Sequence, residues 1–322
     1  MRLFYFYNFK DTFFKIKSGC LLLVDLIEAF KKPWFDCSVR CFAAALFYTI
    51  YKLENKPSSS FSIALKYIRH VVSSGNSRGH RIHSPFIYQF VRKVLFNDDR
   101  IAAPIEVRKF YRKLREDKSV LNIKDFGAGS RITDAHVRTV SSIARHSSIT
   151  RCQGDFLYRL CLWYKPSRVV EFGTGLGIST AFISSGAENA NITTIEGSPE
   201  KHHFASANVP SGAAGSIEFL MGHFDDHFGE VLESLENRTM VFLDGDHTYE
   251  STMKRTSQIL EANDFEEMMV VMDDIYWSEG MEKAWKELVK SVEGAFFIDL
   301  FHFGIIFMRK DISSQYFRLR LI

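Results

Sequence analysis

Residues 169–180 read VVEFGTGLGIST and join an apolar strand to a helix through glycines at positions 173, 175 and 177. A turn with so few side chains lets a ligand approach the backbone closely, next to the N–H groups that open the following helix. A second apolar run, Ile192–Ile195, leads into Glu196. A doubly wound fold places its ribose-binding acid at about this distance from the loop. These features predict an α/β domain that binds an adenosine-containing cofactor.

The spacing of the glycines argues against two common nucleotide loops. A dinucleotide fingerprint has a third glycine at its sixth position, where this chain has Ile178. A P-loop supplies a lysine to phosphates, and no lysine lies between Pro166 and Lys201. A cofactor with a sulfonium and an amino acid tail fits better. Glu171, just ahead of the glycines, is a candidate acceptor for the ammonium of that tail.

The loop and the acid after the second strand resemble the class I S-adenosylmethionine-dependent methyltransferases, whose loop reads E/D-x-G-x-G-x-G. The resemblance implies a doubly wound, Rossmann-like sheet that is mostly parallel with an antiparallel last strand, and S-adenosylmethionine as cofactor. The alternative interpretation is a glycine-rich turn in another α/β domain. The cofactor-binding residues that the resemblance implies are Glu171, Gly173, Thr174, Gly175, Gly177, Ser179, Glu196, Gly197, Gly222, His223, Phe224 and Asp244.

The segment Gly222–Asp225 follows another strand-like run and lies between Glu196 and the next acids. Such enzymes bind adenine here, through the backbone at the glycine and a flat or apolar neighbour. Phe224 is the candidate neighbour, and the alternative is that Phe224 is a core residue.

Two later strands end in acidic residues. Met240–Leu243 leads into Asp244, and Met269–Met272 leads into Asp273 and Asp274. In an open parallel sheet, ligands bind beyond the carboxyl ends of the strands, so we expect these acids to face the cofactor crevice. Carboxylates that converge there must be paired, protonated or bound to a cation.

These two strand ends resemble those of the catechol and caffeoyl-CoA type of O-methyltransferase. The resemblance implies that Asp244, Asp273 and Asp274 bind Mg²⁺ or another divalent cation, to which carboxylate oxygens are suited. The chain departs from the family at Asp274, where an Asn is usual, and so carries an extra negative charge at this position. His247 stands where the family has a lysine as general base.

The implied catalytic residues are therefore His247 and Asp244. A histidine near its ordinary pKa of about 6.5 accepts a proton at neutral pH, so the exchange of lysine for histidine is chemically reasonable. The alternative is that His247 only hydrogen-bonds at a helix start.

The surrounding sequence predicts helices that alternate with strands, as in a parallel sheet. Gln153–Leu157 begins an amphipathic helix, while Ser198-Pro199 and Ser278-Glu279 read as helix starts. Residues 295–309 read as two neighbouring strands joined at a turn. We assign residues 150–322 to the catalytic domain.

Before residue 150 we expect helical additions, namely an apolar and aromatic extension over residues 1–60 and a basic helical cap region over residues 61–149. Residues 61–120 hold thirteen Lys or Arg against five Asp or Glu. Such a block attracts an anionic substrate, RNA or a membrane, and the alternative is a solvated helix face. Within it, Ser84-Pro85 starts one helix and Ile105–Glu116 forms another.

A second glycine-rich segment, Asp125–Ser130, lacks a following apolar helix and a second strand with a terminal acid. It reads as a lid or substrate-side loop, or as a plain turn. Together with Arg81–Phe86 it resembles the leader segment of uncharacterised bacterial methyltransferases.

The composition agrees with a globular, cytoplasmic protein. The chain has 322 residues with a net charge of +3, and its five cysteines contain no C-x-x-C pair, which favours reduced thiols. No apolar run is long enough to span a membrane. Residues 1–50 read as helices that contact a membrane surface or a partner, or as an upstream extension from a misassigned start.

The sequence thus predicts a methyltransferase that methylates a hydroxyl of a small molecule, with assistance from a divalent metal. One alternative is a metal-independent methyltransferase for RNA or protein, although the Asn/Asp-Pro-Pro-Tyr segment of amine methylation is absent. Another is a non-catalytic protein that binds S-adenosylmethionine. We also list a homodimer among the expected assemblies.

Overall fold

The computed structural model of the chain describes residues 57–74, 84–96, 101–123, 137–210, 212, 214–262, 265–310 and 312–321. The chain divides into two compact units, residues 1–65 with 322 and residues 66–321. Of the first unit, only the start of helix α4 (Pro57–Ser73) lies within the described residues. The sequence predictions for residues 1–56, Arg81–His83 and Asp125–Ser130 lie outside them, and the domain boundaries at 60 and 149 remain predictions.

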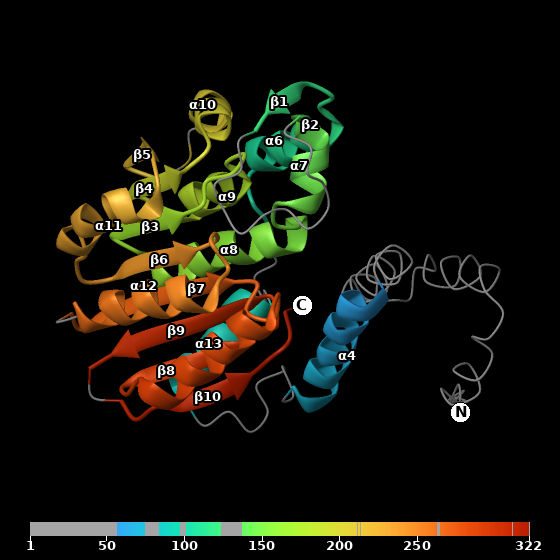
Figure 1. Cartoon of the computed structure of the whole chain (residues 1–322). Coiled ribbons are helices and arrows are strands. Elements are labelled where there is room, and N and C mark those ends of the chain that lie inside the picture. The colour runs from blue at the N-terminus through green and yellow to red at the C-terminus, as the bar shows by residue number, and fades with distance from the viewer. Residues whose placement is uncertain are drawn as a thin grey trace, which may run out of the picture. The chain divides into compact units, whose positions relative to one another are not determined.

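The second unit is built on an eight-stranded sheet, counted over the described residues, with strand order β10-β8-β9-β7-β6-β3-β4-β5 (Figure 1). β9 runs antiparallel to both neighbours, and the other pairs are parallel. This confirms the predicted doubly wound sheet. The strands are β3 (Arg168–Phe172), β4 (Asn191–Glu196), β5 (Ser216–Met221), β6 (Thr239–Leu243), β7 (Glu267–Asp273), β8 (Ala295–Asp299), β9 (Phe303–Arg309) and β10 (Gln315–Arg318).

The position of the site follows from the strand order. β3 lies between β4 and β6, so the chain builds outward from β3 in one direction and then, from β6, in the other. A crevice opens beyond the carboxyl ends of the strands at such a reversal, and this is where doubly wound folds bind their ligands. The glycine turn after β3 and the acids after β6 and β7 are therefore at the same edge of the sheet.

Helices cover both faces of the sheet. Phe156 in α8 (Arg151–Tyr164) stacks on Phe303 of β9, with ring centres 5.3 Å apart. The next residue, Gly304, faces Trp285 in α13 (Glu279–Ser291). Neighbouring residues of a strand point to opposite faces, so α8 and α13 lie on opposite sides. The helices of this layer structure are α8 (Arg151–Tyr164), α9 (Ile178–Gly186), α10 (Pro199–Asn208), α11 (Phe224–Glu233), α12 (Tyr249–Glu261) and α13 (Glu279–Ser291).

Side-chain caps explain where several helices begin. Thr150 and Gln153 form a capping box that opens α8, two residues before the predicted start. The Ser198 and Ser278 hydroxyls accept from backbone N–H groups at the starts of α10 and α13, as the sequence predicts. Each cap satisfies an N–H group that has no partner inside the helix.

Shorter elements precede α8: α5 (Pro85–Phe90), a π-helical turn η1 (Val91–Leu95), α6 (Ile105–Glu116), the hairpin β1 (Val120–Asn122) and β2 (Val137–Thr139), and α7 (Val140–His146). The predicted helix after Ser84 is confirmed, with Ile87 and Phe90 buried. In α6 the apolar side is buried, and the basic residues Lys109, Arg112 and Lys113 face solvent.

The predicted strand pair in residues 295–309 is the antiparallel pair β8 and β9. The sequence gives no sign of β10, which adds a further parallel strand beside β8. Within the described residues, no helix combines the length and apolar character needed to cross a membrane.

Candidate functional site

The glycine turn folds tightly against the neighbouring strands. The N–H groups of Gly173 and Thr174 both donate to the carbonyl of Ile195, at 3.0 and 3.2 Å. Gly173 has a φ of +106°, and a Cβ there would lie 1.9 Å from the backbone oxygen of Asp244. The turn can therefore close over the end of β6 only with glycine at this position.

Glu196 is bonded to the turn from the end of β4. Its Oε2 accepts from the N–H of Gly175 at 2.8 Å, and its Oε1 accepts from the N–H of Ser198 at 2.8 Å. The side chain is 8% exposed. A carboxylate oxygen has two lone pairs, so each oxygen keeps one for a further donor such as a ribose hydroxyl.

A cavity of about 340 Å³ lies beyond the carboxyl ends of these strands. Its volume is in the range of small-molecule sites. A Cβ built on Gly175 would meet no atom within 4 Å, so open space lies directly above the turn. The predicted residues that line the cavity are Gly173, Thr174, Gly175, Ser179, Glu196, Gly197, Gly222, His223, Phe224 and Asp244.

Glu171 lies behind the turn and does not line the cavity. The side chain is fully buried, and its Oε2 accepts from the hydroxyls of Thr180 and Thr194 at 2.5 and 2.7 Å. Its Oε1 is buried without a partner among the described residues. Burial raises the pKa of Glu171 above its ordinary value, against the three hydroxyl contacts that lower it. In this arrangement Glu171 supports the turn through Thr180 and Thr194.

The turn between β5 and α11 forms another wall of the cavity. Gly222 has a φ of +151°, and the N–H of His223 donates to Asp226 Oδ2 at 3.1 Å. Phe224 packs edge-on against Phe172, with ring centres 5.4 Å apart. Phe224 thus contacts the core residue Phe172 on one side and lines the cavity on another, and its role as the adenine neighbour remains a prediction.

The three acids predicted to bind metal are at the ends of β6 and β7, but only Asp244 lines the cavity. Burial, together with the charge of Asp274, raises the pKa of both Asp244 and Asp273. Asp273 Oδ1 is buried without a partner in the described part of the chain. No group of three or more His, Cys, Asp or Glu residues there is placed to hold a metal ion. The metal site remains a prediction.

Asp274 has a φ of +51°, and its N–H donates to the carbonyl of His302 at 2.6 Å. Among residues other than glycine, Asn and Asp adopt this left-handed conformation most readily. The backbone therefore accepts Asp at the position where the O-methyltransferases that the sequence resembles have Asn.

His247 lies on the turn between β6 and α12, and it does not line the cavity. Its Nε2 is 3.8 Å from Oδ1 of Asp244, which does. Burial lowers the pKa of His247, although the nearby charges of Asp274 and Asp246 raise it. The ring is therefore neutral at pH 7 and has a lone pair for a proton. The helix start is capped by Thr248, whose hydroxyl accepts from the N–H of Ser251.

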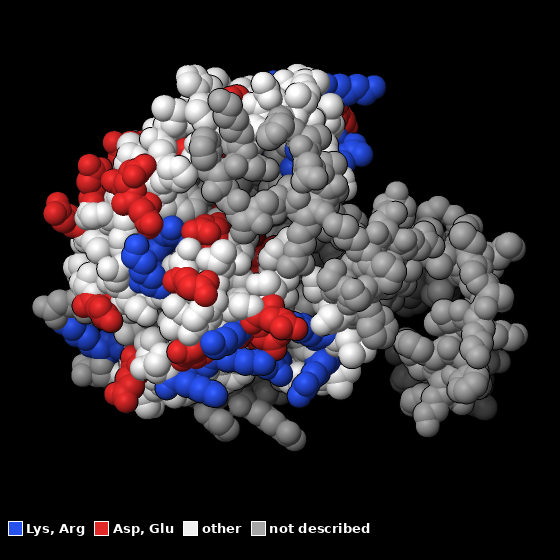
Figure 2. Space-filling model, in the orientation of Figure 1, with Lys and Arg blue, Asp and Glu red and all other residues white. Residues whose placement is uncertain are grey.

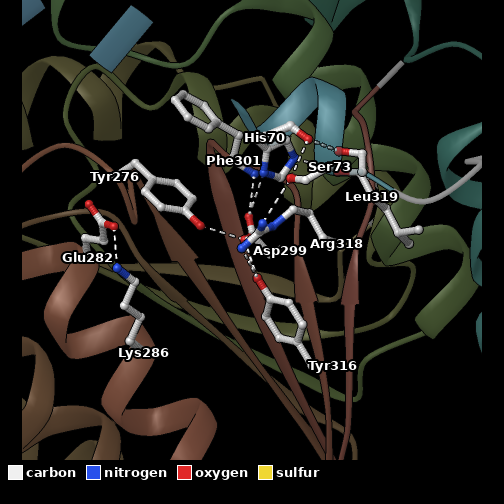
Figure 3. Close-up of polar contacts among 11 residues, drawn as sticks. His70, Ser73, Tyr276, Glu282, Lys286, Asp299, Phe301, Tyr316, Arg318 and Leu319 are labelled. Carbon is white, nitrogen blue, oxygen red and sulfur yellow. Dashed lines mark hydrogen bonds and ion pairs between the residues drawn. The ribbon is translucent and has the colours of Figure 1, made fainter. Parts of the chain in front are cut away.

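A second polar cluster surrounds the fully buried Asp299 at the end of β8 (Figure 3). Its Oδ2 accepts from the hydroxyls of Tyr276 and Tyr316 at 2.7 and 2.6 Å. Arg318 Nε lies 3.3 Å from the same oxygen, and His70 Nδ1 lies 3.3 Å from Oδ1. Asp299 therefore joins β10 and helix α4 to Tyr276, two residues after the predicted metal ligand Asp274.

Several residues of the cavity wall could not be predicted from the sequence. Ser147–Ile149 line it from the end of α7, and Lys201, Asp246 and Arg255 line it from α10, the turn after β6, and α12. None belongs to a recognisable motif. Only Asp246 carried a local signal, since it directly follows the Asp244-Gly245 pair.

The sheet topology and the cavity at its point of reversal define a Rossmann-like methyltransferase fold. Residues 170–275 match the family model described as a methyltransferase domain. The chain therefore carries a methyltransferase domain, and its enzyme class is methyltransferase.

The chain is also similar to solved structures of methyltransferases. One is an O-methyltransferase from Bacillus cereus in complex with SAH, at 15% identity and a TM-score of 0.46, over 70% of this chain and 97% of that one. Another is the SAH-bound methyltransferase PaMTH1 of Podospora anserina, at 15% identity and a TM-score of 0.49, over 71% and 98%. A third is the O-methyltransferase TomG of Streptomyces achromogenes with SAM, at 14% identity and a TM-score of 0.47, over 67% and 95%. No curated protein matches the chain.

Proposed function

We propose that this chain binds S-adenosylmethionine in the cavity above the glycine turn and transfers its methyl group to a hydroxyl of a small molecule. The observation that carries the proposal is the convergence of four separate sequence segments on one cavity. These are the glycine turn, the segment from Glu196 to Ser198, the segment from Gly222 to Asp225, and Asp244 with its neighbours.

The cavity wall suits the parts of this cofactor. Each oxygen of Glu196 keeps a lone pair for the ribose hydroxyls. The hydrogen bonds from the N–H groups of Gly175 and Ser198 hold the carboxylate in one orientation. Phe224 offers an aromatic surface for adenine. The open space at Gly175 admits the amino acid end close to the backbone, next to the N-terminus of α9.

When bound, S-adenosylmethionine supplies a sulfonium methyl group that an acceptor oxygen attacks in line as the C–S bond breaks. The chain's own contribution is to position the two reactants and to receive the acceptor's proton. His247 is the proposed proton acceptor, because burial keeps its ring neutral and its Nε2 lies 3.8 Å from Oδ1 of Asp244, which lines the cavity. Asp244 is proposed to orient the acceptor from the cavity wall.

A divalent cation on Asp244, Asp273 and Asp274 is a separable part of the proposal. Its support is the oxygen donor chemistry, the Asp273 Oδ1 that has no partner among the described residues, and the raised pKa values of Asp244 and Asp273, since a cation would offset the charge that these acids share. Bound there, a cation would lower the pKa of an acceptor hydroxyl. The proposed positioning of the reactants and the proton acceptance by His247 do not depend on this cation.

The experiment is a methyl-transfer screen with isotope-labelled S-adenosylmethionine over phenols, catechols, sugars, lipids and RNA. We expect label on a small-molecule hydroxyl, and loss of most of that label in Asp244→Asn, which is isosteric. Label on RNA alone would contradict the proposed acceptor class. Absence of label on every class, in a protein shown to bind the cofactor, would contradict the proposed transfer to a hydroxyl.

A further inference from the structure

Arg255 contacts two walls of the cavity at once. It lies in α12, is 8% exposed and lines the cavity. Its Nη1 donates to Asp246 Oδ2 at 3.0 Å, and its Nη2 donates to Asp225 Oδ1 at 3.2 Å. The guanidinium carbon lies 5.2 Å from the centre of the Phe224 ring. One buried cation thus joins the first turn of α11 to the turn before α12.

The turn before α12 needs such a partner. Asp246 has a φ of +50°, in the left-handed region, which Asp enters more readily than most residues but at a cost that glycine does not bear. A residue persists there when the surrounding structure holds it. The carbonyl of Asp246 accepts from the N–H of Thr248 at 2.6 Å, and His247 lies between the two. The dihedral angles of Asp246 therefore set the position of His247 relative to Asp244.

The two ion pairs of Arg255 differ in their exposure to water. The side chain of Asp225 is 58% exposed and also lies 3.6 Å from Lys254, which is 59% exposed. Figure 2 shows acidic side chains gathered over α11 with a basic group next to them. Water screens a pair of this kind. Asp246 is 29% exposed, so water screens its ion pair with Arg255 less than it screens the pair with Asp225.

The contact with Phe224 adds an attraction between the cation and the ring face. Phe224 is also confined on another side, because a Cβ on Gly245 would come within 2.8 Å of its ring. Arg255 Nε is buried and has no partner among the described residues. The guanidinium therefore fixes both the ring of Phe224 and the backbone of Asp246.

We propose that Arg255 is a positioning residue that couples the cofactor seat to the catalytic turn. By holding Phe224 and Asp246 in a single arrangement, it makes the adenine side and the proton-accepting side of the cavity form together. The roles of Phe224 and His247 in this inference rest on the proposed function. The coupling itself rests on the contacts of Arg255.

The kinetic test compares Arg255→Met with Arg255→Lys, and it uses Lys254→Met as the matched control. Arg255→Met should raise KM for S-adenosylmethionine and lower kcat, each by on the order of tenfold or more, which is the factor for a lost hydrogen bond between charged groups. Arg255→Lys should reverse part of the change in KM and in kcat, because lysine keeps the positive charge but lacks the planar set of donors that reaches two carboxylates at once. Lys254→Met removes a neighbouring charge that, within the described part of the chain, pairs with the exposed Asp225, and both KM and kcat should stay at the wild-type value.

Hydrogen exchange of the cofactor-free proteins gives a second readout that needs no methyl transfer. Arg255→Met should speed exchange at the N–H of Thr248, which donates to Asp246, and at the N–H of Asp226, which donates to His223. Exchange in the strands of the sheet should stay unchanged.

Faster exchange in only one of the two turns, or in neither, would overturn the coupling. So would a change of KM without kcat, or of kcat without KM. If the wild type neither binds S-adenosylmethionine nor transfers a methyl group, the proposed function fails, and the exchange measurement still decides whether Arg255 couples the two turns.

Discussion

Gly173 and Gly175 form a matched pair for testing the glycine turn. Both have positive φ, at +106° and +57°, so alanine strains the backbone at either position. Their surroundings differ. A Cβ on Gly173 would lie 1.9 Å from the backbone oxygen of Asp244, whereas a Cβ on Gly175 would meet nothing within 4 Å and would project into the cavity.

The expected magnitudes follow from these distances. Placing alanine in the left-handed region costs about 1–2 kcal/mol, which applies to both variants. Gly173→Ala adds an overlap with backbone atoms, and overpacking of this kind costs about 1–3 kcal/mol more. The free energy of unfolding should therefore fall by about 2–5 kcal/mol in Gly173→Ala and by about 1–2 kcal/mol in Gly175→Ala, out of roughly 5–15 kcal/mol for a folded domain.

Urea unfolding and calorimetric titration with S-adenosylmethionine separate the two effects. Gly173→Ala should be the less stable variant. Gly175→Ala should fold, and it should bind the cofactor at least about tenfold more weakly, a loss of about 1.4 kcal/mol. Wild-type affinity in a folded Gly175→Ala protein would refute the reasoning, because the space above the turn would then not belong to the cofactor.

Three further predictions concern the acids and the Asp299 cluster. If a cation binds at the strand ends, EDTA should lower methyl transfer and Asp273→Asn should lower Mn²⁺ binding measured by electron paramagnetic resonance; full activity in EDTA would exclude the metal. Burial lowers the pKa of His70 in the folded chain below its ordinary value of about 6.5. As the pH falls, the unfolded chain therefore binds the proton at a higher pH than the folded chain does. The free energy of unfolding of the wild type should therefore fall relative to His70→Gln between about pH 7.5 and about pH 5.5, by at most about 1.4 kcal/mol per pH unit, and a constant difference in urea unfolding would contradict this. Tyr316→Phe removes one donor from the buried Asp299 carboxylate and should cost about 1.5 kcal/mol in urea unfolding, whereas an unchanged midpoint would show that Tyr276 and Arg318 suffice.

The parts of the fold that could be predicted from the sequence are those encoded by one short segment. Where an apolar run leads directly into a turn, the segment predicts both the strand and the edge of the sheet at which the turn lies. Val169–Thr180 and Met240–Asp244 are such segments. Caps are equally local, so the starts of α10 and α13 could be predicted from Ser198 and Ser278.

The features that could not be predicted depend on distant segments. β10 is only four residues long, Gln315–Arg318, and becomes a strand by pairing with β8. Arg255 looks like an ordinary helix residue until α12 packs beside the start of α11, which carries Asp225. Glu171 precedes the glycines as a cofactor contact would, yet hydroxyls from α9 and β4 take one of its oxygens. No local pattern indicates these contacts.

The central claim is that the cavity above the glycine turn binds S-adenosylmethionine, with Glu196 as the ribose acid. Calorimetric titration of the full chain, wild type against Glu196→Gln, tests it most directly. The account predicts saturable binding of one cofactor per chain in the wild type, weakened at least about tenfold when the carboxylate becomes an amide. No binding heat in the wild type, or equal affinity in both proteins, would contradict it.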